Sequence, residues 1–137
     1  MKKFVFDACA LIALLADEEG ADKVEYILRK AETDDCLIYM NKINILEIYY
    51  WVYREESKEK AEKVLEKILS LPIIVIETFE DNVFKEAGRL KATYRMSLAD
   101  SIALAEAKIR KAEILTSDHH EFDVVEKKEK IKFYWIR

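Results

Sequence analysis

Residues 3–15 read Lys-Phe-Val-Phe-Asp-Ala-Cys-Ala-Leu-Ile-Ala-Leu-Leu, and this stretch decides the fold. Its first four residues predict a short buried strand, and the uncharged run Ala8 to Leu15 predicts a helix that is covered on both sides. Asp7 lies at the junction between them. A buried strand followed at once by a buried helix is typical of α/β proteins, so we expect Asp7 at the carboxyl edge of a sheet.

The rest of the chain repeats this alternation of strand and helix. Helices are predicted at 18–32, 43–53, 58–69, 78–94 and 97–111, with one further helical turn within 119–126. Strands are predicted at 36–40, 73–76, 113–116 and 131–136. The expected helix caps are Ser57, Thr78 in a capping box with Asp81, and Ser97 in a capping box with Asp100. The pattern predicts one α/β domain over residues 1–137, with a central, mainly parallel β-sheet flanked by helices on both faces.

Composition excludes several classes of protein. The 137 residues are 51% hydrophobic, which argues against disorder, and the isolated Gly20 and Gly88 cannot form a glycine-rich phosphate loop. A net charge of −4 does not favour a polyanion, so a contact with nucleic acid requires a local patch. Cys9 and Cys36 form no disulfide or metal motif, which indicates a reducing compartment.

The amino terminus matches a signal peptide only in part. Lys2 and Lys3 precede an apolar run, but the charge of Asp7 interrupts that run, and the uninterrupted remainder is short. No segment has the length needed to span a bilayer, so no membrane contact is expected and the predicted location is the cytoplasm.

Four acidic residues stand in apolar surroundings, unlike most of the other acids, which share helix faces with lysine or arginine. They are Asp7, Glu47, Asp100 and Asp118. Glu47 interrupts an aromatic helix, with Asn44 one turn before it on the same face, and Asp7 and Asp118 follow predicted strands. Because the carboxyl ends of parallel strands meet at one edge of a sheet, we expect the four side chains to come together.

Each acid also has an ordinary structural explanation. Asp7 is placed to cap the following helix, and Asp100 to complete a capping box with Ser97. Glu47 is free to pair with a core lysine, and Asp118 to serve as a turn residue.

A cluster of carboxylates would require neutralisation. Two carboxylates about 4 Å apart repel by roughly 4 kcal/mol at an effective dielectric of about 20, so a cluster must take up protons or hold a cation. An oxygen donor set suits Mg²⁺ or Mn²⁺, and one or two such ions commonly catalyse phosphoryl transfer.

Four segments in order resemble the PIN-domain nucleases, in particular the VapC-type toxins of toxin–antitoxin pairs. They are residues 4–12, 44–47, 97–103, and 115–118 with Phe122. The resemblance covers essentially the whole chain, and it implies a Mg²⁺- or Mn²⁺-dependent endoribonuclease. Carried over by position, Asp7 and Asp100 would be the principal metal ligands, with Glu47 and Asp118 completing the acidic pocket. All four would be catalytic, metal-binding residues.

The resemblance also has less regular parts. Thr116 matches a family hydroxyl that can orient a ligand or a water, whereas Cys9 replaces the small polar residue of many relatives. The fourth acidic position varies, so Glu121 or Asp123 can share its work. Family members are usually homodimers that a cognate antitoxin inhibits, and both partners, besides RNA, are therefore expected here.

Three further features allow two interpretations. His119 and His120 predict an exposed turn, with a minor role near the substrate left open. The aromatic set on one helix predicts core packing plus an interface and comprises Tyr49, Tyr50, Trp51 and Tyr53. The basic set on a later helix could contact phosphates or form a solvated face and comprises Lys85, Arg89, Lys91 and Arg95.

Two other functions stay open. The main alternative is a non-catalytic PIN-like module that dimerises or holds a partner, and the presence of all four acids weighs against it. A phosphatase with Asp7 as nucleophile ranks lower, because Cys9 stands where haloacid-dehalogenase-like enzymes carry a second aspartate.

Overall fold

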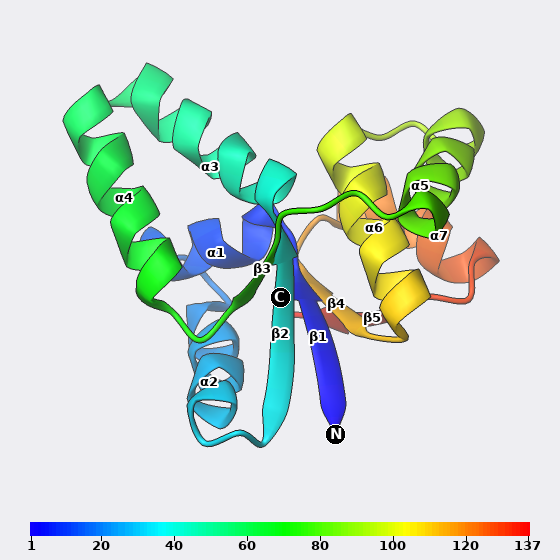
Figure 1. The fold of residues 1–137 in the computed structure, drawn as a ribbon, viewed down its shortest axis with the longest axis horizontal. Helices are drawn as coiled ribbons and strands as arrows, with labels where there is room; N and C mark the ends of the chain where they lie inside the picture. Colours follow the sequence, from blue (N-terminus) through cyan, green and yellow to red (C-terminus); the bar gives the residue numbers. More distant parts are fainter.

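The computed structural model describes residues 1–137 and contains a five-stranded sheet in which all neighbouring strands are parallel (Figure 1). The strands are β1 (Lys2–Phe6), β2 (Cys36–Asn41), β3 (Ile74–Ile76), β4 (Glu113–Thr116) and β5 (Lys132–Trp135). Their order across the sheet is β3-β2-β1-β4-β5. The predicted α/β fold is confirmed, and the stretch that begins the sequence supplies the central strand.

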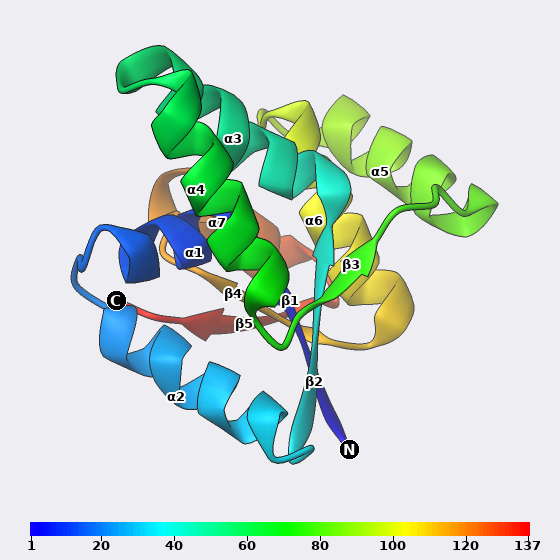
Figure 2. The same ribbon diagram turned by 60° about the vertical axis from the view of Figure 1, so that its left-hand side comes forward.

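Seven helices connect and cover the strands. They are α1 (Ala8–Leu15), α2 (Ala21–Glu32), α3 (Lys42–Glu55), α4 (Lys58–Ser70), α5 (Asp81–Thr93), α6 (Leu98–Arg110) and α7 (His119–Lys128). The views in Figures 1 and 2 place α1 to α4 on one side of the sheet and α5 to α7 on the other. None of these helices combines the length and the apolar character needed to cross a membrane.

Alternation along β1 creates two cores. Phe4 and Phe6 point into a core shared with α1 to α4, whereas Val5 belongs to a second core shared with α5, α6 and α7. Successive side chains of a strand face opposite sides of the sheet, so a central strand needs apolar residues at every position. This explains why the buried part of β1, Phe4 to Phe6, is an uninterrupted apolar run, whereas Lys2 and Lys3 at its start are exposed.

The strand order changes direction at β1, and the carboxyl edge of the sheet is open at this point. After β1 the chain adds β2 and β3 on one side, and it then crosses to add β4 and β5 on the other. Phe6 is in register with Leu115, so Asp7 and Thr116 follow at the ends of adjacent strands. Ligands of open α/β sheets bind at such a switch point.

Some helix starts differ from prediction. The capping box of Thr78 with Asp81 is wrong, because Asp81 is already the first residue of α5 and Glu80 occupies the cap position without a side-chain bond. Ser57 and Ser97 do cap their helices, accepting bonds from the backbone N–H groups of Lys60 (3.1 Å) and Asp100 (3.0 Å).

Two further helices have other lengths than predicted. Helix α2 begins at Ala21 and not at Glu18, because Gly20 before it has a φ of 99°, which a helix does not allow. A Cβ at Gly20 would also lie 2.6 Å from the carbonyl oxygen of Ile136. The region after β4 forms the ten-residue helix α7, longer than the single turn expected.

Candidate metal centre

Asp7 is the most deeply buried of the four acids. It directly follows β1, is 1% exposed, and caps α1 through Oδ1, which accepts a hydrogen bond from the Ala10 N–H at 2.9 Å. The predicted capping role is therefore confirmed, but it uses only one carboxylate oxygen. The other, Oδ2, is buried and has no hydrogen-bond partner.

The environment of Asp7 disfavours its charge. Its pKa is raised to about 7, mainly by burial and in smaller part by the charges of Asp100 and Asp118. The Thr116 hydroxyl and the Ala10 amide act in the opposite direction, although Thr116 is not placed to form a hydrogen bond to Oδ2. Asp7 is thus a carboxyl group in need of a positive partner.

Asp100 lies in the first turn of α6 and is half-buried. Its pKa is raised to about 7, mainly by burial and then by the charges of Glu47 and Asp118, while the hydrogen bond from Ser97 acts in the opposite direction. The cap formed by Ser97 begins the helix at this level, which places the carboxyl group at the carboxyl edge of the sheet. Capping by Ser97 and a place in the acidic group are compatible roles.

Glu47 and Asp118 complete the group. Burial raises the pKa of Glu47, and the charge of Asp118 adds to this effect. Glu47 appears in none of the ion pairs of the structure, so the alternative of pairing with a core lysine is not met. Asp118 caps α7 through Oδ1, which accepts from the Glu121 N–H at 3.2 Å, and its own N–H donates to Thr116 Oγ1 at 3.1 Å.

The pKa of the Cys9 thiol is affected by all four acids. Burial raises the pKa of Cys9, and so do the charges of the four carboxylates, named in order of effect as Asp7, Asp118, Asp100 and Glu47. Each of the four acids therefore lies near enough to Cys9 to affect the pKa of its thiol. As the side chains stand, no three His, Cys, Asp or Glu groups in the chain have the spacing of a metal site.

The donor set nevertheless fits a hard divalent cation. Its carboxylates are unpaired by any lysine or arginine, two of them have a pKa near 7, and Asp7 Oδ2 is buried without a donor. Mg²⁺ and Mn²⁺ prefer oxygen ligands of this kind. Asp7, Glu47, Asp100 and Asp118 are the residues that would hold such an ion.

The neighbours on α7 divide into two groups. The negative charge of Glu121 raises the pKa of Asp100, so Glu121 borders the acidic group. His119 is held away from it, because Nδ1 contacts Asp123 Oδ1 at 2.8 Å and Nε2 contacts the carbonyl oxygen of Arg137 at 2.8 Å. The His119 ring also stacks on Trp135 with centroids 3.8 Å apart, and the bond with Asp123 raises its pKa.

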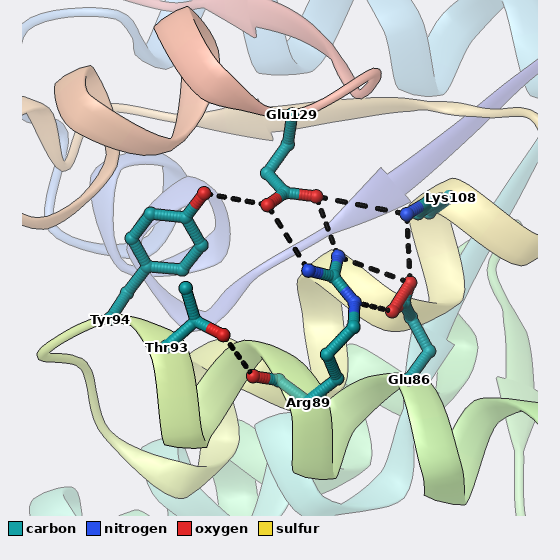
Figure 3. Close-up of polar contacts among 6 residues, drawn as sticks. All are labelled: Glu86, Arg89, Thr93, Tyr94, Lys108 and Glu129. Carbon is teal, nitrogen blue, oxygen red and sulfur yellow. Dashed lines mark hydrogen bonds and ion pairs between the residues drawn. The ribbon is translucent and has the colours of Figure 1, made fainter.

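The basic face of α5 is largely occupied by ion pairs. Arg89 contacts Glu86 and lies 2.6 Å from Glu129, and Lys108 of α6 lies 2.8 Å from Glu86 (Figure 3). Lys85 pairs with Asp81 at 3.3 Å. These pairs support the interpretation of a solvated, structural face for Lys85 and Arg89.

Sequence reasoning missed a buried polar link between α3 and α6. Glu106 is 1% exposed and accepts from Asn41 Nδ2 at 2.9 Å, and it also pairs with Arg110 at 3.1 Å. An acid inside the apolar run of α6 is the same signal that singled out Glu47. Asn44, noted only for sharing a face with Glu47, donates from Nδ2 to the Ala99 carbonyl at 3.1 Å.

Fold and site together define the class of this protein. An all-parallel sheet of order 3-2-1-4-5 with unpaired carboxylates at its switch point makes it an α/β protein with a candidate metal centre. The model of the PIN domain family matches residues 4–128. The chain therefore belongs to the PIN domain family of nucleases, as the sequence resemblance implied.

Solved structures share this fold at low sequence identity. DNA-bound VapBC from Salmonella typhimurium matches with a TM-score of 0.73 and 17% identity over 100% of both chains. VapBC2 from Rickettsia felis, bound to a promoter DNA fragment, matches with a TM-score of 0.73 and 15% identity over 97% of this chain and 98% of that chain. VapC20 from Mycobacterium tuberculosis, a sarcin-ricin loop cleaving toxin, matches with a TM-score of 0.68 and 13% identity over 89% and 94%. Curated protein sequences yield no match.

Proposed function

We propose that this protein is a divalent-metal-dependent endoribonuclease and the toxin of a toxin–antitoxin pair. The observation that carries the proposal is Asp7 Oδ2, a buried carboxylate oxygen without a donor at the switch point of the sheet. The charges of Asp100 and Asp118 act on the same carboxyl group. Buried negative charge that nothing in the chain neutralises is typical of catalytic sites.

The residues of the site have separable roles in this mechanism. Asp7 and Asp100 would be the principal ligands, with Glu47 and Asp118 completing the pocket. A bound Mg²⁺ or Mn²⁺ supplies a Lewis acid that polarises the scissile phosphate and lowers the pKa of a water. The Thr116 hydroxyl, which accepts from the Asp118 N–H, fixes the loop that carries the fourth acid.

RNA as the substrate is supported by the comparisons. VapC20 is described as cleaving the sarcin-ricin loop, and this chain shares its fold. The acidic residues carry the chain's excess of negative charge, because 27 acids less these four equal the 23 bases. With a cation bound, the remaining surface need not repel a polyanion.

A cognate antitoxin and a second copy of the chain are the proposed protein partners. The VapBC structures and a toxin–antitoxin complex from Klebsiella pneumoniae share the fold, the latter with a TM-score of 0.61. An apolar hollow of about 350 Å³ lies between α1, α3 and α4, and its apolar lining includes Ile12, Leu15, Ile48, Trp51, Val52 and Val64. Lys60, Lys67 and Glu56 also line it, and an apolar segment with a mainly acidic flank fits this hollow as the antitoxin contact.

The decisive test is RNA cleavage by the purified, partner-free protein. Cleavage of total RNA is expected with Mg²⁺ or Mn²⁺, and it should stop with EDTA and in Asp7→Asn, which keeps a capping oxygen but loses the charge. Asp22→Asn is the matched control, because Asp22 is an exposed acid on α2, outside the acidic group, and should be dispensable. Metal-independent cleavage, or full activity of Asp7→Asn, would refute the proposal.

The same purified protein distinguishes the nuclease from the main alternative, a non-catalytic binding module. The exposed aromatic side chains of α3, Tyr50, Trp51 and Tyr53, are 41–49% exposed and would also suit a module that only binds a partner. Such a module would show neither RNA cleavage nor stabilisation by Mn²⁺. Sedimentation at equilibrium tests the homodimer independently of activity.

A further inference from the structure

We propose that Asn44 is a positioning residue that fixes the spacing between Glu47 and Asp100. This role rests on the proposed function, because Glu47 and Asp100 are two of the four proposed metal ligands. The two acids come from different helices, α3 and α6, which pack mainly in different cores of the molecule. The sheet alone therefore does not determine how far apart these two side chains lie.

The hydrogen bond of Asn44 joins the two helices at the level of the acids. Asn44 is completely buried, and its Nδ2 donates to the carbonyl oxygen of Ala99 at 3.1 Å. Ala99 immediately precedes Asp100 in the first turn of α6. Glu47 follows Asn44 by one turn of α3, on the same face. A single side-chain bond thus ties the turn that carries one acid to the backbone beside the other.

A second link joins the junction of β2 and α3 to α6 and lies farther from the acids. Asn41 caps α3, and its Nδ2 donates to Glu106 Oε2 at 2.9 Å, about two turns of α6 beyond Ala99. Arg110 holds the other oxygen of Glu106 at 3.1 Å and stacks over the Tyr39 ring at 4.5 Å. This link fastens the base of α3, and neither of its residues adjoins a proposed ligand. It provides a comparison for Asn44 with the same donor group and the same partner helix, α6.

The unpaired oxygen of Asn44 argues against a purely structural role. Two buried side-chain polar atoms in the chain lack a hydrogen-bond partner, Asp7 Oδ2 and Asn44 Oδ1. Leaving a buried carbonyl oxygen without a donor costs stability, and an apolar side chain of similar size would avoid that cost. Asp7 belongs to the candidate centre, and Asn44 lies next to it. In both places a less stable arrangement keeps the carboxylates of the centre in position.

Two matched variants test the role of Asn44. In Asn44→Leu, which has the same branched shape but no donor, we expect Mn²⁺ affinity measured by calorimetry and kcat for RNA cleavage each to fall about 10- to 100-fold. The KM for RNA should stay within about twofold of wild type, because the RNA contacts are unchanged. In Asn41→Ser, whose hydroxyl still caps α3, we expect a lower Tm with Mn²⁺ affinity and kcat close to wild type.

The outcomes distinguish this inference from the function on which it rests. Wild-type protein that neither binds Mn²⁺ nor cleaves RNA would overturn both. If the wild-type protein is active, two results would overturn the positioning role alone. One is an Asn44→Leu variant with unchanged Mn²⁺ affinity and kcat, and the other is an equal loss of both in Asn41→Ser. All assays are run well below the Tm of each variant. If Asn44→Leu does not fold, Asn44→Ser is used, because its shorter side chain loses the bond to Ala99 while keeping a polar group.

Discussion

Two groups of poorly exposed carboxylates in this molecule have opposite electrostatic surroundings. At the carboxyl edge, burial and mutual repulsion raise the pKa of Asp7 and Asp100 to about 7. Between α5, α6 and the end of α7, Arg89 and Lys108 lower the pKa of Glu86 and Glu129 (Figure 3). The Glu86 and Glu129 side chains are only 12% and 9% exposed, so burial alone does not decide the direction.

The difference lies in the partners that the fold supplies. In the ion-pair network of Glu86, Arg89, Lys108 and Glu129, every carboxylate has a cationic donor, and Tyr94 adds a hydroxyl donor to Glu129. At the carboxyl edge, Asp7 and Asp100 form no ion pair with a lysine or arginine, and the charges of neighbouring acids raise the pKa of both. The ion-paired glutamates stabilise the fold, whereas the acids of the carboxyl edge are left unneutralised. This difference indicates that the acids of the carboxyl edge serve a function other than folding.

The largest expected effect comes from removing charge at the carboxyl edge. Because the folded pKa of Asp7 lies above its ordinary value of 3.8, its contribution to stability is fully present below pH 3.8 and is lost as pH rises through about 7. Asp7→Asn should therefore stabilise the metal-free protein at pH 8 by up to about 4 kcal/mol, and hardly at pH 3. Urea unfolding with EDTA at both pH values measures this difference.

Asp22→Asn serves as the control for this variant, because Asp22 is an exposed acid on α2. It should leave the free energy of unfolding within about 0.5 kcal/mol of wild type. An Asp7→Asn protein that is less stable than wild type at pH 8 would contradict the interpretation of the carboxyl edge as strained by charge.

Metal binding should offset the loss of folding stability that the buried carboxylates cause at the carboxyl edge. A ligand at about 100 times its Kd stabilises the folded state by about 2.7 kcal/mol. We expect this gain from Mn²⁺ in wild type and in Arg89→Met, and little gain in Asp7→Asn. Chemical denaturation with and without Mn²⁺ gives the three differences. An equal gain in Asp7→Asn would show that the ion binds elsewhere.

The two regions also differ in how far the sequence could predict them. Asp7, Glu47, Asp100 and Asp118 stood out because acids in apolar runs or at strand ends are unusual locally, and parallel strands bring such positions to one edge. Whether they form the centre stays a prediction until activity is measured. All five strands were also predicted, because buried strands are short apolar runs between polar segments.

The ion-pair network could not be predicted in this way. Glu129 is 40 residues from Arg89, and nothing in its local sequence distinguishes it from other surface acids. The pairing depends on where α7 ends relative to α5, which is set by tertiary packing. The length of α7 and the start of α5 were wrong for a related reason, since caps and helix ends depend on single side-chain contacts that spacing alone does not decide.

A smaller effect is expected from breaking the ion-pair network. Arg89→Met removes the donor shared by Glu86 and Glu129 and should destabilise the protein at pH 7 by about 2 kcal/mol. Because both glutamates have a folded pKa below the usual 4.5, their stabilisation is present above pH 4.5 and is lost as pH falls through the folded values. The difference between variant and wild type should therefore shrink by pH 3, the opposite trend from the carboxyl edge. A loss that does not depend on pH would mean that Arg89 acts through packing of its aliphatic stem.

The smallest effect is expected at the hydroxyl of Tyr94, which donates to Glu129 Oε2 at 2.6 Å. Tyr94→Phe keeps the half-buried ring and should cost about 1 kcal/mol in urea unfolding at pH 7, whereas Tyr26→Phe, at an exposed tyrosine, should cost nothing measurable. Tyr94 and Arg89 share Glu129, so their effects should not add. Once Arg89 is gone, the hydroxyl is the remaining uncharged donor to that carboxylate, and removing it should cost more than it does in wild type. Strictly additive losses in the double variant would mean that the network is a set of independent pairs. The two groups of carboxylates would then differ in two ways, in the direction of their pKa shifts and in whether their members affect one another.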